Sequence, residues 1–282
     1  MKKVWFITGA TRGFGRLIAR KALDRGDAVV ATGRNPEDVT KALGQSEQVL
    51  VLPLDVRSDS QALTAAKTAF EHFGRIDVLV NNAGYGLLGA VEEANAREVE
   101  NQFATNVFGL LNVTRAVLPY MRSAKSGHII NLSSIGGYAA YAGWGIYGAT
   151  KFAVEGISEA LSIELAPLGI HATVVEPGFF RTDFLSATSL VSTGRSIEDY
   201  HSTVGAMRVF ADGADHQQPG DPAKLAEALM VLADTKVPPR RLPLGSDTVA
   251  KIEEKHRAVT EELTEWRSLA LSTDFTAIRL DT

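Results

Sequence analysis

The sequence contains no cysteine among its 282 residues. Disulfide bonds, thiolate ligands for metals and a cysteine nucleophile are therefore all excluded. A chain without cysteine suits a reducing compartment, and we expect a cytoplasmic protein. The composition is otherwise ordinary for a globular protein, with 45% apolar and 22% charged residues, which is enough to build a core of full size.

Excess positive charge and long apolar runs are also lacking. The formal net charge is -4 and no basic block stands out, so nucleic acid is not an expected partner. No apolar run approaches the ~20 residues that cross a bilayer, so no membrane span is expected. The short run 4–8 leads directly into a glycine-rich loop, which indicates a first strand rather than a signal peptide. The histidines show no ligand spacing, so no metal site is expected; they are His72, His128, His171, His201, His216 and His256.

Short apolar runs alternate with helical patterns from the first residues onward. The runs are rich in Val, Ile and Leu without alternation, as in parallel strands buried on both faces; they cover 4–8, 28–32, 49–52, 78–80, 129–132 and 172–175. Helical periodicity separates them over 16–25, 61–73, 99–121 and 147–165. This order predicts right-handed βαβ units, and so a Rossmann-type, doubly wound α/β sheet with helices on both faces.

The pattern weakens after Pro177. Residues 179–220 mix small polar and apolar side chains, and we expect a mobile substrate-binding lobe there with one or two short helices. Asp221-Pro222 opens a helix that runs to Asp234, and a last helix over 246–271 forms a C-terminal extension. No linker or repeat divides the chain, so residues 1–282 are interpreted as a single dinucleotide-binding and catalytic domain.

A glycine-rich loop joins the first strand to the first helix. Its glycines are Gly9, Gly13 and Gly15, and Thr11, Arg12 and Phe14 lie between them. Glycine permits a tight turn and a close approach of the backbone to a pyrophosphate, while the following helix directs its N–H groups at the anion. The loop therefore predicts a dinucleotide site.

Two arginines indicate which nicotinamide cofactor the site prefers. Sites that prefer NAD carry an acid after the second strand, but here that strand leads into Gly33-Arg34. Arg34 and Arg12 would suit the extra phosphate of NADP, which a guanidinium grips with two hydrogen bonds. Asp55-Val56 follows the third strand and is expected to contact the adenine.

Tyr147 and Lys151 lie four residues apart and therefore on one face of a predicted helix. Tyrosine titrates near ~10, and a neighbouring ammonium group lowers that pKa toward the range where proton transfer is efficient. Ser134 leaves the preceding strand thirteen residues upstream of Tyr147, at the sheet edge where ligands bind in open α/β folds. These three side chains are candidates for one catalytic centre.

The combined motifs resemble the short-chain dehydrogenase/reductase family over about residues 3–182. The resemblance rests on Thr8-Gly9-xxx-Gly13-x-Gly15, Asn81-Asn82-Ala83-Gly84, Asn106, Ser134, Tyr147-xxx-Lys151 and Pro177-Gly178. Phe14 departs from the aliphatic residue usual at its place. Within the family, the chain looks most similar to reductases related to hydroxysteroid and retinol dehydrogenases.

The resemblance implies a role for each motif. Tyr147 exchanges a proton with the carbonyl or alcohol oxygen, Lys151 binds the nicotinamide ribose and lowers the pKa of Tyr147, and Ser134 polarises the carbonyl. Asn106 holds a water that links Lys151 to solvent. The remaining cofactor contacts are expected from Gly9, Gly13, Gly15, Asn82, Ala83, Gly84, Pro177, Gly178 and Thr182. The implied activity is NADP(H)-dependent interconversion of a carbonyl and an alcohol.

Aromatic residues cluster where the substrate is expected. Tyr141 and Trp144 lie between Ser134 and Tyr147, and Phe179 and Phe184 follow Pro177-Gly178. Aromatic walls favour a bulky hydrophobic ketone, aldehyde or alcohol over a small charged acid.

Other interpretations remain open at this point. The chain could be an NAD-linked alcohol dehydrogenase, a reductase of carrier-bound acyl chains, or a non-enzymatic redox sensor that binds dinucleotide without turnover. Family members assemble as homodimers or homotetramers, and the resemblance implies the same here. The tail over 246–271 could cover the fold, mediate a dimer or block one of those contacts.

Overall fold

The computed structural model describes residues 2–186, 189–214 and 217–275. Seven parallel strands form the central sheet in the order β3-β2-β1-β4-β6-β7-β9. Their bounds are β1 (Val4–Ile7), β2 (Ala28–Gly33), β3 (Val49–Pro53), β4 (Val78–Asn81), β6 (Gly127–Leu132), β7 (Ile170–Pro177) and β9 (Arg241–Leu244). Chain order reverses at β1, which pairs with β2 on one side and β4 on the other. This is the doubly wound, Rossmann-type topology, whose switch point lies beside β1.

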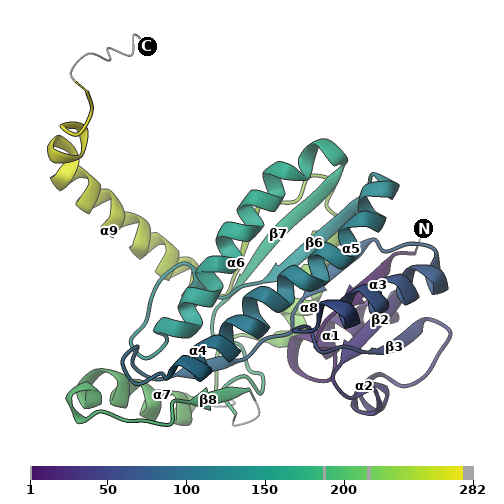
Figure 1. The fold of residues 1–282 in the computed structure, drawn as a ribbon, viewed down its shortest axis with the longest axis horizontal. Helices are drawn as coiled ribbons and strands as arrows, with labels where there is room; N and C mark the ends of the chain where they lie inside the picture. The colour runs from purple at the N-terminus through teal and green to yellow at the C-terminus, as the bar shows by residue number, and fades with distance from the viewer. Residues whose placement is uncertain (1, 187–188, 215–216, 276–282) are drawn as a thin grey trace.

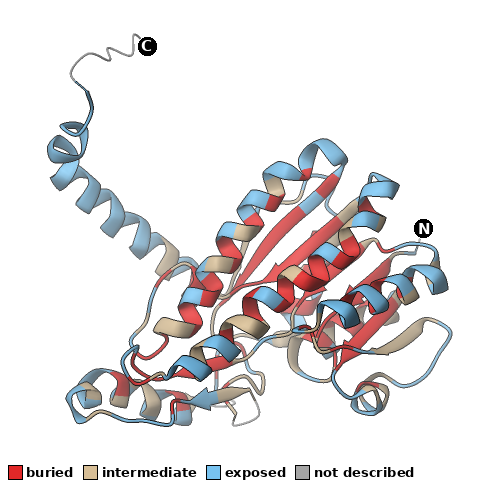
Figure 2. Ribbon diagram, in the orientation of Figure 1, coloured by how far each residue is buried: buried red, intermediate tan, exposed pale blue. Residues whose placement is uncertain are grey.

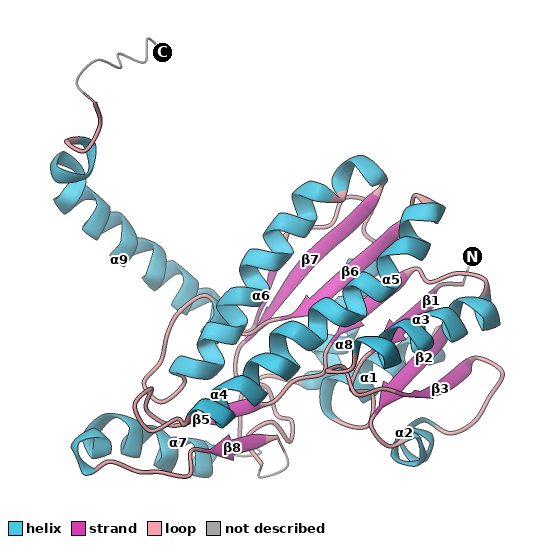
Figure 3. Cartoon of the chain, in the orientation of Figure 1, coloured by secondary structure: helices cyan, strands magenta, loops and turns pink. Residues whose placement is uncertain are grey.

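Helices cover both faces of the sheet, as Figure 3 shows. The main helices are α1 (Gly13–Asp24), α2 (Pro36–Leu43), α3 (Asp59–Phe73), α4 (Ala96–Phe103), α5 (Leu110–Ala124), α6 (Gly145–Glu164), α7 (Ala206–Ala214), α8 (Pro222–Asp234) and α9 (Ser246–Leu271). Strand residues alternate between the two layers: Phe6 packs in the core with α3, α5 and α6, whereas Trp5 and Ile7 pack with α1 and α8. Figure 2 shows the buried strands between the exposed outer faces of the helices.

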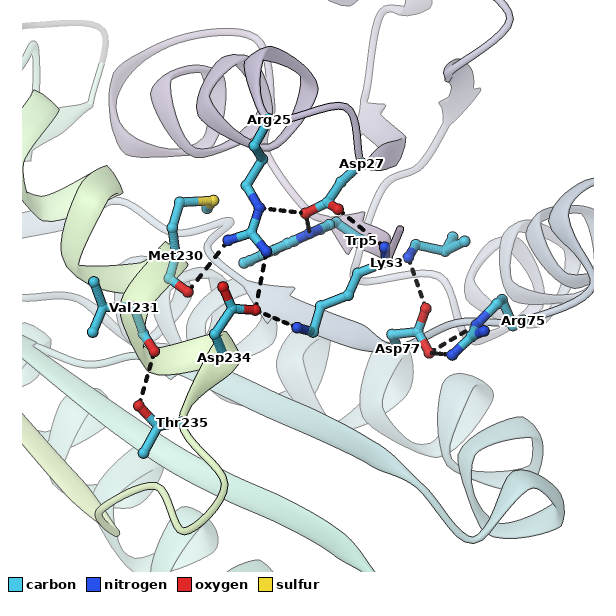
Figure 4. A network of polar contacts seen from close by, with 11 residues as sticks. Lys3, Trp5, Arg25, Asp27, Arg75, Asp77, Met230, Val231, Asp234 and Thr235 are labelled. Atoms are coloured by element: carbon cyan, nitrogen blue, oxygen red, sulfur yellow. Dashed lines mark hydrogen bonds and ion pairs between the residues drawn. The ribbon is translucent and has the colours of Figure 1, made fainter. Parts of the chain in front are cut away.

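A charged network ties the chain together at the amino ends of the strands (Figure 4). Buried Asp27 accepts hydrogen bonds from the backbone N–H of Lys3 at 3.0 Å and from Trp5 Nε1 at 2.9 Å, and it pairs with Arg25 at 3.0 Å. Arg25 also pairs with Asp234 at the end of α8, at 2.9 Å. The network therefore joins β1 to α1 and α8 at the amino ends of the strands, the side of the sheet opposite the carboxyl ends.

The predicted strands and main helices are all present, and three differences concern the central sheet and the helices that cover it. The predicted helix over 99–121 is interrupted by a π-helical segment, η1 (Ala104–Gly109), between α4 and α5. Strand β9 was not predicted, because Pro243 lies inside it and proline is tolerated only at a sheet edge such as this one. Helix α2 was also not predicted; Asn35 caps it by accepting from Glu37 N, and Pro36 is its first residue.

The segment over 179–220 forms a lobe beyond the carboxyl ends of the strands. Its strand β8 (Leu190–Ser192) pairs with β5 (Gly86–Leu88), a short strand after β4. A 3₁₀ turn η4 (Glu198–Tyr200), a π-helical turn η5 (His201–Gly205) and α7 follow. Two further 3₁₀ turns, η2 (Ile135–Gly137) and η3 (Ala166–Leu168), flank α6. The last helix, α9, extends away from the body (Figure 1).

Candidate active site

The glycine loop between β1 and α1 forms a tight cradle. Gly9 has a φ of +68°, a left-handed conformation that favours glycine. A Cβ at Gly15 would lie 2.3 Å from the carbonyl oxygen of Gly9 and 2.6 Å from Asn82 Nδ2, so only glycine fits there. The cradle thus leaves backbone N–H groups at the start of α1 open toward the sheet edge, where an anion is stabilised.

Asn82 holds this loop against the end of β4. Its Nδ2 donates to the carbonyl of Thr8 at 2.8 Å and to that of Gly9 at 3.1 Å. The Thr8 hydroxyl in turn accepts from the backbone N–H groups of Asn82 and Ala83, at 2.9 and 3.0 Å. The Asn81-Asn82-Ala83-Gly84 motif therefore supports the loop from below, at the switch point of the sheet.

Ser134, Tyr147 and Lys151 come together at the carboxyl end of β6. The Ser134 hydroxyl accepts from the backbone N–H of Gly136 at 3.1 Å, and it lies close enough to the phenol of Tyr147 to lower its pKa. Lys151 Nζ donates to the carbonyl of Leu132 at 2.7 Å and lies 5.7 Å from the centre of the Tyr147 ring. Helix α6 thus presents the tyrosine and the lysine on one face, opposite the serine.

Burial controls the protonation of these groups. It raises the pKa of Tyr147 to about 12, and the hydrogen bond with Ser134 acts in the opposite direction. Burial is the larger effect on this phenol, whereas the family resemblance implies that Lys151 lowers its pKa. Burial lowers the pKa of Lys151 to about 8, and the nearby Glu155 opposes that shift. At neutral pH the phenol is therefore protonated.

Asn106 lies in the π-helical segment η1, behind the cavity rather than on its wall. Its Nδ2 donates to the carbonyl of Tyr85 and to the Thr150 hydroxyl, both at 3.1 Å, and its Oδ1 accepts from Tyr85 N at 3.2 Å. These bonds join the chain after β4 to α6 next to Lys151. The π-helical geometry, a feature often found at functional sites, turns the asparagine inward.

One cavity of about 870 Å³ connects the glycine loop, the polar triad of Ser134, Tyr147 and Lys151, and the lobe. Its wall contains every residue that the sequence assigned to the cofactor, the substrate or catalysis except Gly15 and Asn106, which support it from behind. The residues that the sequence places there and the structure brings together are Gly9, Thr11, Arg12, Gly13, Phe14, Arg34, Asp55, Val56, Asn82, Ala83, Gly84, Ser134, Tyr141, Trp144, Tyr147, Lys151, Pro177, Gly178, Phe179, Thr182 and Phe184.

Charged side chains stand at one end of this cavity. Arg34 is exposed at the end of β2, and Arg12 Nη2 donates to the Ser189 hydroxyl of the lobe at 3.0 Å. Asp55 accepts from Arg57 at 2.6 Å, and this bond holds the pKa of Asp55 below its usual range, with a smaller effect from Arg34. This end therefore combines two arginines that face the opening with an ion pair beside them.

The other end is apolar and lies around Tyr147. The ring of Trp144 is 5.5 Å from that of Tyr147, and Phe184 of the lobe is 5.6 Å from Tyr147 and 6.3 Å from Trp144, measured between ring centres. Leu185 and Leu88 pack in the same cluster. The hydroxyls of Ser134 and Tyr147 therefore face a pocket with apolar walls.

Sequence reasoning missed several wall residues. Tyr85 directly follows the Asn82-Ala83-Gly84 motif and lines the cavity, as does Arg57, two residues after Asp55. Their proximity to recognised motifs was the available signal. Gln218 carries no such signal, because only the fold of the lobe brings it to the cavity.

The described residues hold no group of three or more side chains placed to bind a metal ion, and His216 lies outside them. Within the same described ranges, no helix has the length and hydrophobicity to cross a bilayer.

Comparison with known proteins places the chain. Residues 3–190 match the family model described as short chain dehydrogenase. The chain belongs to the short-chain dehydrogenase/reductase family, and it is an oxidoreductase of that family. It is 39% identical over 274 residues to Oxidoreductase BOA17 of Botryotinia fuckeliana, covering 96% of this chain and 99% of the relative. It is 38% identical over 245 residues to 3-ketodihydrosphingosine reductase of Bacteroides thetaiotaomicron, covering 86% and 88%.

Solved structures agree with this placement. A short-chain dehydrogenase from Streptomyces avermitilis has a TM-score of 0.90 and 40% identity, covering 98% of this chain and 100% of that one. Several neighbours are described with a bound nucleotide, and two of them serve as examples. The closed form of serine dehydrogenase is complexed with NADP+, at a TM-score of 0.72 and 30% identity, covering 86% and 94%. A 3-ketoacyl-(acyl-carrier-protein) reductase from Brucella melitensis is complexed with NADH, at 0.73 and 25%, covering 86% and 96%.

Proposed function

We propose that this short-chain dehydrogenase/reductase uses NADP(H) to interconvert a hydrophobic ketone or aldehyde and the corresponding alcohol, with Tyr147 as the acid and base. The observation that carries the proposal is one cavity with a glycine cradle and two arginines at one end and, at the other, the half-buried Ser134 and the buried Tyr147 beside an apolar pocket. That arrangement has room for a dinucleotide and a substrate side by side.

The cradle fits a dinucleotide. Gly9 adopts a left-handed turn and Gly15 leaves no space for a side chain, so a pyrophosphate is able to approach the backbone at the start of α1. Arg12 and Arg34 would hold a 2′-phosphate on the adenosine ribose. When bound, the nicotinamide supplies the hydride for reduction or accepts it in oxidation.

The residues of the chain account for the proton and for orientation. Tyr147 is protonated at neutral pH, which is the form that a proton donor to a carbonyl oxygen needs. Ser134 is placed to hold the same oxygen, so the two hydroxyls would stabilise the negative charge that develops on it. Lys151 would stabilise the phenolate left after proton transfer. In the oxidation direction, the phenolate takes the proton back from the alcohol.

The pocket favours a bulky apolar substrate. Trp144, Tyr141 and Phe184 offer aromatic surfaces at the carbonyl position. One relative is named as a reductase of a keto group, in 3-ketodihydrosphingosine, which is in keeping with this class of substrate. The comparisons include both NADP+ and NADH complexes, so the preference for NADP(H) rests on Arg12 and Arg34.

The experiment follows NADPH and NADH consumption by the purified protein against a panel of hydrophobic ketones and aldehydes. We expect turnover with NADPH, and a loss of roughly 100- to 10,000-fold in kcat for Tyr147→Phe. Tyr200→Phe is the matched control, because Tyr200 is a tyrosine outside the cavity wall that bonds to Glu92. Full activity in Tyr147→Phe would refute the assignment of the acid. Tight binding of NADPH without turnover on any carbonyl would favour a sensor instead.

The cofactor preference is tested separately by binding. Arg34→Ala is expected to weaken NADPH by roughly ten- to a hundredfold, the value of a hydrogen bond between charged groups, and to leave NADH unchanged. Arg16→Ala is the control, since Arg16 is exposed on α1 outside the cavity wall. An equal loss for both nucleotides would contradict a role for Arg34 in selecting the phosphate.

A further inference from the structure

Helix α9 projects from the body and is covered by no described part of the chain over most of its length. Figure 2 shows it exposed almost to its base, and every residue from 253 to 275 is exposed. Only its first turns are held: Asp247 accepts from Phe179 N at 2.7 Å, Lys251 lies 5.6 Å from the centre of the Tyr141 ring, and His256 bonds with Tyr138. At 1.5 Å per residue, the 26-residue helix is ~39 Å long.

An apolar stripe follows this projecting helix. Apolar side chains recur at alternating spacings of three and four residues, interrupted only by His256; the positions are Val249, Ile252, His256, Val259, Leu263, Trp266 and Ala270. This is the heptad pattern of a helix that packs against another helix. Trp266 is 59% exposed, Leu263 56% and Leu269, which flanks the stripe, 61%. Such side chains, gathered on one face, indicate an interaction surface.

The charge of the helix points to a protein partner. Residues 246–271 carry six acidic and four basic side chains. Helices that bind anionic membranes carry an excess of Lys and Arg on the polar face, and α9 has the opposite balance.

The stripe is complementary to itself when two copies run antiparallel. Pairing Leu263 with the partner's Trp266 also pairs Val259 with the partner's Ala270, so a large side chain meets a small one at the ends. On the flanks, Thr260 then faces the partner's Arg267 and Glu262 faces the partner's Leu269. No like charges meet between residues 259 and 270, and the two bodies lie at opposite ends of the paired helices.

We propose that the outer part of α9, residues 259–270, is a dimerisation arm that packs antiparallel against the same segment of a second copy of this chain. In such a two-fold symmetric pair, Trp266 and Leu263, which are exposed in the single chain, would be buried against the second copy. The base of the arm contacts Tyr138, Tyr141 and Phe179, so the dimer would also steady the mouth of the cavity.

The first test measures the mass of the full chain by light scattering or sedimentation, from roughly 1 to 100 µM because a short interface binds weakly. The variant Leu263→Glu/Trp266→Glu is expected to halve the mass without changing the circular dichroism of the body or its unfolding. The matched control Ala258→Glu/Ser268→Glu adds the same charge to other faces of the helix and is expected to keep the mass. An unchanged mass in the first variant, or a monomeric wild type, would overturn the proposal.

The second test fixes the direction of pairing. Because the natural chain has no cysteine, engineered thiols are the only ones present. A short bifunctional thiol reagent is expected to join Thr260→Cys chains to Arg267→Cys chains in a mixture, with little product from either alone. Efficient joining of Thr260→Cys to itself would indicate parallel pairing and contradict the arrangement. If the protein instead floated with vesicles of phosphatidylcholine and phosphatidylserine, and this flotation depended on Trp266, the partner of α9 would be a lipid surface and the dimer proposal would be wrong.

Discussion

Two carboxyl groups are buried together behind the active site. Glu176 ends β7 just before Pro177 and is only 1% exposed, and Glu155 lies on α6 one turn after Lys151. Arg241 of β9 is the cation beside them, with its Nε 3.2 Å from Glu155 and 3.6 Å from Glu176. One guanidinium serves two buried acids, so one of the acids is expected to hold its proton near neutral pH.

The stability of the protein should depend on this proton. Burial, and next the negative charge of Glu155, raise the pKa of Glu176 from 4.5 to about 8. Between these values the folded protein binds more protons than the unfolded chain, so its free energy of unfolding falls as pH rises through the window from about 4.5 to about 8. At 1.36 kcal/mol per pKa unit, the loss approaches ~5 kcal/mol at most.

Replacing Glu176 by glutamine removes this loss while keeping the shape of the side chain. Glu176→Gln should match the wild type near pH 5 and exceed its free energy of unfolding by roughly 3–5 kcal/mol at pH 8. Urea denaturation at pH 5, 6, 7 and 8 measures the difference. Glu47→Gln, at an exposed position, is the control and should show no such trend. If Glu176→Gln instead lost stability at pH 8, Glu176 would have to be an ionised partner of Arg241, and the reasoning would fail.

Three further predictions follow from the site and its support. Gly15→Ala puts a Cβ 2.3 Å from the Gly9 carbonyl, so NADPH affinity should fall at least tenfold by titration while the fold persists. Asp27→Ala leaves the buried Trp5 Nε1 and the part-buried N–H of Lys3 without their acceptor and should cost about 1–3 kcal/mol in urea denaturation, with KM unchanged because the site is distant. Glu155→Gln removes a charge that raises the pKa of Lys151, so the basic limb of the kcat/KM profile should move to lower pH; an unmoved limb would argue against this coupling.

Local sequence patterns were enough to predict the parallel strands of the sheet and the residues of the candidate site. Buried parallel strands need apolar side chains on both faces, and that local requirement is visible as short Val and Ile runs. Glycine spacing after β1 and the four-residue interval from Tyr147 to Lys151 are set by turn and helix geometry alone, so these motifs carried their arrangement with them.

Other features of the site depend on contacts between residues that are far apart along the chain. The π-helical turn at Asn106 is stabilised by hydrogen bonds from Asn106 to Tyr85 and Thr150, which belong to other elements. No local sequence pattern predicts it. Likewise, the high pKa of Tyr147 arises from burial, and Phe184 of the distant lobe is one of the residues that pack around it. Side-chain contacts and desolvation depend on residues far apart along the chain, whereas strand and helix patterns depend on near neighbours. For that reason the sequence predicted which residues form the candidate active site. The pKa values of those residues, the apolar wall of the cavity and the exposure of α9 follow from the fold.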